Sequence, residues 1–353
     1  MFIYSKSSGL NNAAIGKLET PIKMIIEHES TLLEQQGGPC SWLFNVEKSN
    51  KFGETIINQT AFDVFKPTDE GAAAETDTVI ESGKKFIEHV QFTKEFVITA
   101  EMMEDAAYGV APEAKRRAQY FTRAYYKTIN KLCTDALANG ALASFAFAGK
   151  DIDTTAFDGK PLFHNKHTWG HSTKESGEQS NYYYGDLINT GTARAFDAAV
   201  FPEALYALSD KVRNMLDENG EPLGYTADTL VIPGNRPKLE KVVKTVCGSE
   251  KITGSGNNDI NLHFGNWNVV VLPYWQATDD RMIVMSSEAN KNLAGNMFFN
   301  RVPLTVNNWV DYQTGNYIWN GRCRFGVGFG SYKHAILMVD AASAITNADK
   351  LAV

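Results

Sequence analysis

The stretch PEAKRRAQYFTRAYYKTINKLCTDALAN, residues 112–139, predicts the longest helix of the chain. Its apolar residues recur every three or four positions, which is the spacing of one face of an α-helix. These residues are Ala114, Ala118, Phe121, Tyr125, Ile129, Leu132 and Ala136. Pro112 suits a first helical turn, and Asn139-Gly140 favours a stop. At about 1.5 Å per residue, the helix would form a rod of roughly 40 Å.

The other face of this predicted helix is polar. It carries Lys115, Arg116, Gln119, Arg123 and Lys127. A charged face opposite an apolar stripe is typical of a helix that lies on a core and meets solvent. We therefore favour a solvated face over a ligand-binding one.

Composition limits the possible classes of protein. The chain has 353 residues with 43% hydrophobic content and a formal net charge of −7. This length supports one large domain or two to three modest ones. The acidic balance argues against tight, general binding of nucleic acid, although a local basic patch remains possible. No run of about 18 apolar residues is present, so we expect no membrane-spanning helix.

Cysteine spacing and nucleotide motifs give no sign of a cofactor. Cys40, Cys133, Cys247 and Cys323 lie far apart, which predicts four reduced, mostly buried thiols rather than a zinc ribbon or a disulfide framework. No P-loop, dinucleotide fingerprint or GxSxG motif occurs. We expect neither a cofactor nor an enzymatic activity.

N-terminal to the long helix, two extended regions are expected. Residues 1–50 read as an arm with one short helix, from Pro21 to about Glu34, and too little apolar pattern to fold alone. Residues 51–98 read as a long hairpin with an acidic tip, KPTDEGAAAETDT. The second strand of this hairpin would be continuous, because Phe86, Val90, Phe92, Phe96 and Ile98 occupy alternate positions.

C-terminal to the long helix, the chain becomes rich in strands. A second helix is predicted over residues 202–218, followed by a buried strand at 230–232 and a short helix. Strands are predicted in 267–275, 281–287 and 331–340, with a further alternating stretch around 322–329.

A histidine cluster raises the alternative of a metalloenzyme. The stretch PLFHNKHTWGHSTKE, residues 161–175, holds His164, His167 and His171, and zinc accepts three such ligands in catalytic sites. These are weak metal candidates, because Gly170 indicates an irregular loop and the charge of Lys166 disfavours a cation nearby. We favour a structural loop, whose histidines could make assembly pH-sensitive if they lie at a subunit contact.

The arm, the hairpin and the long helix all expose strands or apolar faces that a monomer would leave uncovered. Neighbouring copies would cover them, so the sequence favours a subunit of an assembly over a catalyst. We predict subunit contacts at Phe52, Phe62, Lys66 and Pro67 of the hairpin.

The order of these segments resembles the major capsid proteins of tailed bacteriophages, which have the HK97-type fold. The likeness covers about residues 50–340. FTKEFVITAEMMEDA (92–106) is similar to the strand and acidic turn before the family's spine helix, FDGKPLFHNKHTWG (157–170) to a peripheral-domain segment, and DTLVIPGNRPKLEKVVK (228–244) to an axial-domain unit. WNVVVLPYW, DDRMIVMSS and RCRFGVGFGSYKHAIL are similar to the axial domain's final strands.

The resemblance implies an α+β fold of four parts. They are an N-terminal arm (1–50), an extended E-loop hairpin with the following strand (51–100), a peripheral domain with the spine helix 112–139 (101–227) and a β-rich axial domain (228–353). The final strands of the axial domain would return to the peripheral domain.

The resemblance also implies a role. Hexamers and pentamers of this chain would form an icosahedral shell around double-stranded DNA, without sequence-specific binding and without a membrane. The shell would assemble in the cytoplasm of the bacterial host and end in the virion, with a portal protein as a partner. Some relatives carry a long, removed N-terminal extension; the arm here is short and begins with Met1, so a separate scaffolding or decoration protein is expected. No context for a Lys–Asn crosslink at Lys66 is identified. The alternative with the same fold is an encapsulin-type nanocompartment.

Overall fold

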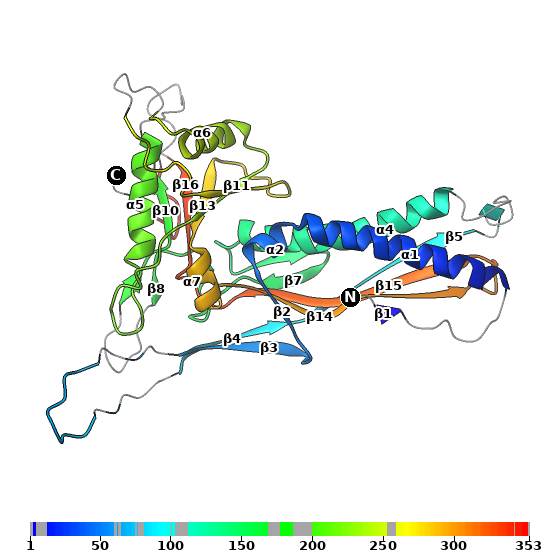
Figure 1. The fold of residues 1–353 in the computed structure, drawn as a ribbon, viewed down its shortest axis with the longest axis horizontal. Helices are drawn as coiled ribbons and strands as arrows, with labels where there is room; N and C mark the ends of the chain where they lie inside the picture. Colours follow the sequence, from blue (N-terminus) through cyan, green and yellow to red (C-terminus); the bar gives the residue numbers. More distant parts are fainter. Residues whose placement is uncertain are drawn as a thin grey trace. The chain divides into compact units, whose positions relative to one another are not determined.

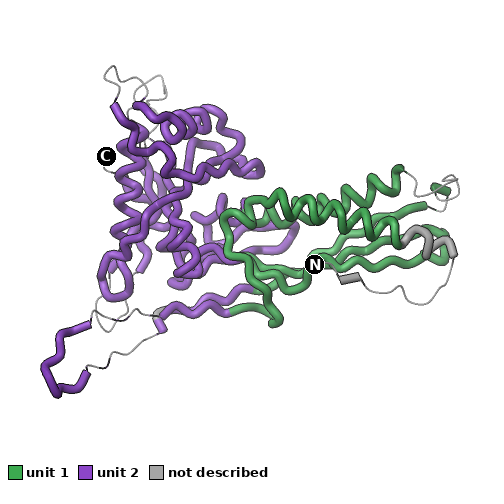
Figure 2. The backbone as a smooth tube through the Cα atoms, viewed as in Figure 1, with its two compact units in different colours: residues 1–54, 88–133, 298–327 green, residues 55–87, 134–297, 328–353 purple. Residues whose placement is uncertain are grey.

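A computed structural model describes residues 3–4, 13–59, 62, 65–74, 76, 81–99, 101–102, 112–168, 177–185, 200–252, 259–341 and 343–351. The chain forms two compact units (Figure 2). Unit 1 combines residues 1–54, 88–133 and 298–327, and unit 2 combines residues 55–87, 134–297 and 328–353. Each unit therefore joins segments that are distant in sequence. The division into arm, hairpin, peripheral and axial parts stays a prediction about their roles in a shell.

Unit 1 is a five-stranded sheet with helices. The strands are β1 (Ile3–Tyr4), β14 (Asn296–Val310), β15 (Tyr317–Phe329) and β5 (Val90–Ile98) in spatial order, with β2 (Asn45–Lys48) also paired to β14. The helices α1 (Ala13–Gln36) and α4 (Pro112–Ala138) lie side by side, as Figure 1 shows, and the short α2 (Pro39–Leu43) follows α1. Ile22, Phe121 and Trp319 meet in one core, so both helices share a single apolar interior with the sheet.

Helix α4 confirms the helix predicted over residues 112–139 to within one residue. Its predicted apolar stripe is buried at Ala114, Ala118, Phe121, Ile129, Leu132 and Ala136, and Tyr125 is half-buried. The periodic pattern was sufficient here because one face of the helix packs along its whole length. That α4 serves as the spine helix of a shell subunit stays a prediction.

The predicted short helix of the N-terminal arm is wrong in extent. Helix α1 begins at Ala13, so Pro21 lies in its interior instead of in its first turn. An interior proline removes one hydrogen bond and disfavours the helix. Ile22 and Ile26 are completely buried in the core of unit 1. This burial ties the segment to the unit and offsets the missing bond.

The predicted continuous second strand of the hairpin is also wrong. It is divided at His89 into β4 (Glu81–Glu88) and β5, with β4 paired to β3 (Gly53–Gln59) and β5 paired antiparallel to β15. The buried His89 ring places Nδ1 at 3.1 and 2.9 Å from the carbonyl oxygens of Lys51 and Phe52. This contact holds the backbone at the point where pairing with β3 ends and pairing with β15 begins. The hairpin therefore consists of β3 and β4, without β5.

Unit 2 is centred on a six-stranded mixed sheet. Its order is β12 (Asn268–Leu272), β11 (Thr229–Pro233), β13 (Arg281–Met285), β16 (Ala335–Asp340), β10 (Tyr182–Gly185) and β17 (Asp349–Lys350). Helices α5 (Val200–Arg213), α6 (Pro237–Gly248) and α7 (Ser287–Asn292) accompany it. The pairs β3–β4, β6 (Ser144–Phe147)–β7 (Lys150–Asp153) and β8 (His167–Thr168)–β9 (Glu178–Gln179) complete the unit. Leu208, Leu230 and Ile336 meet in its core.

The strands predicted in the C-terminal part are present as β11, β12, β13, β15 and β16, although their ends differ from the predicted ones, and α7, β10 and β17 were not predicted. The helix predicted to reach residue 218 ends at Arg213, because the Asp217 carboxylate accepts hydrogen bonds from the amides of Asn219 and Glu221 and organises a turn. The 15-residue strand β14 was not predicted. The four cysteines are buried, and none forms a disulfide in this structure. None of the described helices is long and apolar enough to span a membrane.

Candidate functional site

The histidine cluster contains a buried His–Asp pair. His167 is completely buried in unit 2, with Nδ1 at 2.7 Å from Asp158 Oδ2 and Nε2 at 3.2 Å from the Leu162 carbonyl oxygen. Its ring stacks on Tyr332 with centroids 3.8 Å apart. Burial is the largest influence on Asp158 and raises its pKa. The hydrogen bond and electrostatic attraction from His167, together with the amides of Lys160 and Thr168, outweigh burial, so the pKa of that carboxyl lies below its usual value. Both ring nitrogens are thus engaged by oxygen acceptors.

The other histidines add no metal ligand set. His164 Nδ1 accepts a hydrogen bond from the amide of Lys166, and burial, followed by the nearby His167, lowers the pKa of His164. His171 lies outside the described residues. Within the described ranges, no three His, Cys, Asp or Glu side chains gather around a common point. Sequence reasoning missed Asp158 and Tyr332 as the partners of His167; only the Asp158-Gly159 turn hinted at the first.

Buried lysines anchor the β3–β4 hairpin within unit 2. Lys85 of β4 donates to Asp153 Oδ2 at 2.5 Å and to the hydroxyl of Thr155 at 2.6 Å. Asn58 of β3 donates to Glu218 Oε1 at 2.9 Å, and Lys333 Nζ lies 2.7 Å from the same oxygen. Each of the two ammonium groups therefore has a carboxylate partner, which offsets the free-energy cost of burying its charge.

The Lys333–Glu218 pair is the more deeply buried of the two. Side-chain exposure is 2% for Lys333 and 9% for Glu218. Burial lowers the pKa of Lys333, although the carboxylate of Glu218 opposes this shift. Nothing in the local sequence pattern marked Lys333, because it lies in a run of residues that reads as a strand.

The hairpin itself presents apolar side chains to solvent. Phe62 and Phe65 are 70% and 101% exposed, and Ile57 and Phe86 are also exposed. Of the predicted contact residues, Phe62, Lys66 and Pro67 lie on the hairpin and are exposed. Phe52 belongs to unit 1, where its exposed ring lies 6.0 Å from the Arg324 guanidinium carbon. Their subunit contacts stay predictions.

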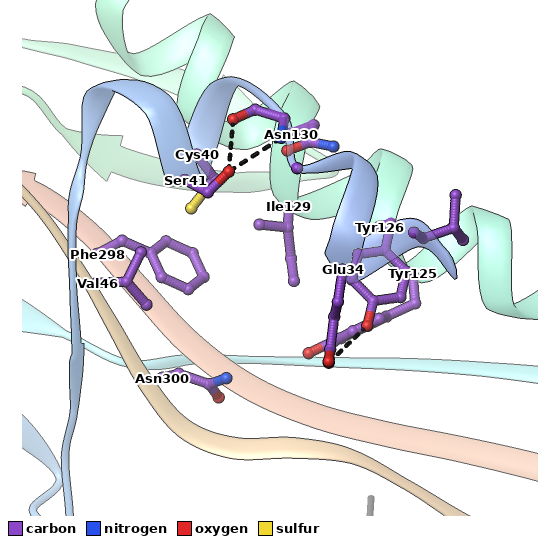
Figure 3. A pocket seen from close by; sticks show the side chains of 13 residues that line it. Glu34, Cys40, Ser41, Val46, Tyr125, Tyr126, Ile129, Asn130, Phe298 and Asn300 are labelled. Atoms are coloured by element: carbon purple, nitrogen blue, oxygen red, sulfur yellow. Dashed lines mark hydrogen bonds between the residues drawn. The ribbon is translucent and has the colours of Figure 1, made fainter. Parts of the chain in front are cut away.

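Unit 1 contains a cavity of about 210 Å³ between α1, α2, α4 and β14 (Figure 3). Tyr125, Ile129 and Phe298 give it an apolar wall. At its polar side, Tyr126 donates to Glu34 Oε1 at 2.9 Å. Cys40 also lines the cavity, and burial raises the pKa of the adjacent Cys133 thiol well above its usual value. A thiol held protonated is a poor nucleophile, so Cys133 is not an activated cysteine.

Comparison with known families identifies the chain. The profile of a family described as phage capsid protein matches residues 83–337, well over half of the sequence. The chain belongs to the phage capsid protein family. This confirms the predicted capsid function, and the comparisons give no support to the encapsulin alternative. No curated protein matches the sequence.

Solved phage capsid structures are similar to this capsid protein. The chain is similar to the capsid of the Cyanophage P-SCSP1u, with a TM-score of 0.51 and 12% identity over 85% of this chain and 87% of that chain. It also matches the capsid of the native GTA particle (0.48, 14%, 86% and 90%) and that of Myoviridae phage XM1 (0.46, 14%, 84% and 90%). The first of these likenesses supports the predicted HK97-like α+β fold.

Proposed function

We propose that this capsid protein is the shell-forming subunit of a tailed phage. It assembles with its own copies into hexamers and pentamers of an icosahedral shell that encloses double-stranded DNA. It acts as a structural protein without enzymatic activity. Assembly takes place in the bacterial cytoplasm, and the mature shell is part of the virion, where a portal and a scaffolding or decoration protein are further partners.

One structural observation supports self-association together with the family match. The β3–β4 hairpin exposes four large apolar side chains, while Lys85 of β4 pairs with Asp153 and Asn58 of β3 donates to the buried Glu218 of unit 2. A two-stranded hairpin gains little stability alone, and exposed apolar surface favours a protein partner. A repeated contact of this kind between identical subunits closes into rings when the rotation allows it.

Electron microscopy of the purified full-length chain tests the proposal. We expect rings or closed shells. A chain that stays monomeric at all concentrations and salt conditions would contradict the proposal.

A variant separates assembly from folding. Phe65→Ser should reduce shell formation, while its thermal unfolding stays that of the native chain, because Phe65 is fully exposed. Loss of assembly together with loss of folding would point instead to a structural role of the hairpin tip.

A further inference from the structure

The solvent face of α4 carries a row of four basic side chains and one tyrosine. Arg116, Tyr120, Arg123, Lys127 and Lys131 are spaced by four, three, four and four residues, so they lie along one stripe of the helix. All five are exposed, and the stripe lies opposite the buried face. We call these five residues the α4 stripe. Helix α4 holds six basic and two acidic residues, although the whole chain has a net charge of −7.

The charge of the α4 stripe is largely uncompensated. Arg123 Nε lies 2.5 Å from Glu29 Oε1 of α1, and the Glu29 carboxylate is 9% exposed. In the described part of the chain, Arg116, Lys127 and Lys131 have no acidic side chain within ion-pair distance. Among the other carboxylates of α1, Glu27 is exposed, and Glu34 accepts the hydrogen bond of Tyr126. The cations of α4 therefore keep a positive potential at this surface.

The shape of the α4 stripe suits a linear polyanion. From Arg116 to Lys131 it extends about 22 Å, at 1.5 Å per residue. Duplex DNA carries one phosphate charge per about 1.7 Å of its axis, so a straight row of cations can neutralise several phosphates without a fitted pocket. A protein partner would be expected to bury aromatic or aliphatic anchors at the centre of its contact. Within the stripe, only Tyr120 could serve as such an anchor.

We propose that the α4 stripe is the surface through which this capsid protein contacts the phosphate backbone of packaged duplex DNA, independently of sequence. The proposal rests on the proposed shell function. It assigns the DNA contact to one helix face in a protein that is acidic overall. The remaining acidic surface repels DNA, so the stripe also fixes which face of the subunit turns toward it.

The test uses the full-length, unassembled chain and a short fluorescent duplex of mixed sequence, titrated by anisotropy at several salt concentrations. The stripe variant is K127E/K131E. Its matched control is K238E/K241E, which makes the same charge change at two exposed positions of α6. We expect the stripe variant to lose at least about tenfold in affinity near 0.1 M salt, and the slope of log K against log salt to become less negative by about 2. The control should bind nearly as the native chain does.

Three outcomes would overturn the proposal. Equal losses in both variants would show a net-charge effect, and unchanged binding in both would show that DNA does not use the stripe. If K127E/K131E binds DNA as the native chain does but fails to form shells, the stripe contacts a protein and not DNA. If the charge reversal prevents folding, as thermal unfolding would reveal, K127Q/K131Q makes the same comparison against K238Q/K241Q.

Failure of the stripe assignment can be distinguished from failure of the proposed shell function. Shells formed by K127E/K131E with weakened DNA binding support both proposals. A native chain that binds DNA through the stripe but never assembles would contradict the shell function and leave the stripe assignment standing.

Discussion

The five-stranded sheet of unit 1 and the β3–β4 hairpin of unit 2 are both β-structure, but different forces hold them. The sheet shares an apolar core with two helices, in which Trp319 is almost fully buried. The hairpin has few buried apolar residues and is held by Lys85–Asp153 and by Asn58 and Lys333 on Glu218. Apolar burial stabilises without demanding one geometry, whereas ion pairs and hydrogen bonds fix a geometry at little net gain. The hairpin is therefore positioned rather than strongly stabilised.

The largest expected effect concerns the sheet. Phe325 is completely buried and stacks on Phe92 at 4.7 Å. Phe325→Ala should lower the free energy of unfolding by about 3–5 kcal/mol through lost burial and a residual cavity. Urea unfolding followed by tryptophan fluorescence measures this loss. Phe325→Leu, which retains most of the volume, should cost clearly less; equal costs would mean that the site is not tightly packed.

The next largest effect concerns the anchor of the hairpin. Lys333→Met leaves the Glu218 carboxylate buried without its ammonium partner, which should cost about 3 kcal/mol in unfolding free energy. A double variant, K333M/E218Q, should recover part of this loss because no unpaired charge remains. A double-mutant cycle in urea measures the coupling. Additive losses would show that the two side chains do not act as a pair.

A pH dependence of similar or smaller size should arise from His334. Burial lowers its pKa to about 4, from the usual value near 6.5. Between these two pH values the unfolded chain binds a proton at this histidine and the folded chain does not. The contribution of neutral His334 to the free energy of unfolding is therefore fully present above about pH 6.5 and falls by up to about 3 kcal/mol toward pH 4. The unfolding midpoint in urea, measured at several pH values, reports this fall.

The control for this pH dependence is a change at the exposed His28. His334→Gln should flatten the fall in stability between about pH 6.5 and 4, whereas His28→Gln should leave it as in the native chain. If both variants keep the native slope, His334 is not its source.

The smallest effect on stability is expected at the exposed face of the hairpin. Phe86→Ser removes a half-exposed ring from β4 and should change the free energy of unfolding by less than about 0.5 kcal/mol. Assembly yield by light scattering should nevertheless fall, since this face has no other role within the described structure. A large loss of stability would show that the ring contributes to unit 2 itself.

The parts of the fold that sequence could predict are those with local causes. The apolar face of α4 was predictable because its helical periodicity is continuous along the chain. The buried strand β11 was predictable because it is a continuous apolar run. Strand β14 was missed because Pro303 and four asparagines weaken its pattern, and its pairing with distant strands decides its state.

The candidate sites were harder to predict for the same reason. The division at His89 depends on carbonyl groups 37 and 38 residues away, and the partner of Lys333 lies 115 residues away. Such pairs have no signature in the residues around either member. The three clustered histidines gave the strongest local signal, but His167 is committed to Asp158 and to packing against Tyr332.

The two buried amines at the hairpin have a practical consequence. Acylating reagents modify neutral amines that they can reach. Both Lys85 of β4 and Lys333, whose partner Glu218 accepts a hydrogen bond from Asn58 of β3, are buried in the native fold. Modification of these two lysines, followed by mass spectrometry after brief exposure to reagent, would therefore time the release of the hairpin in a subunit or in a shell. The native chain thus carries its own reporters of hairpin movement and needs no added label.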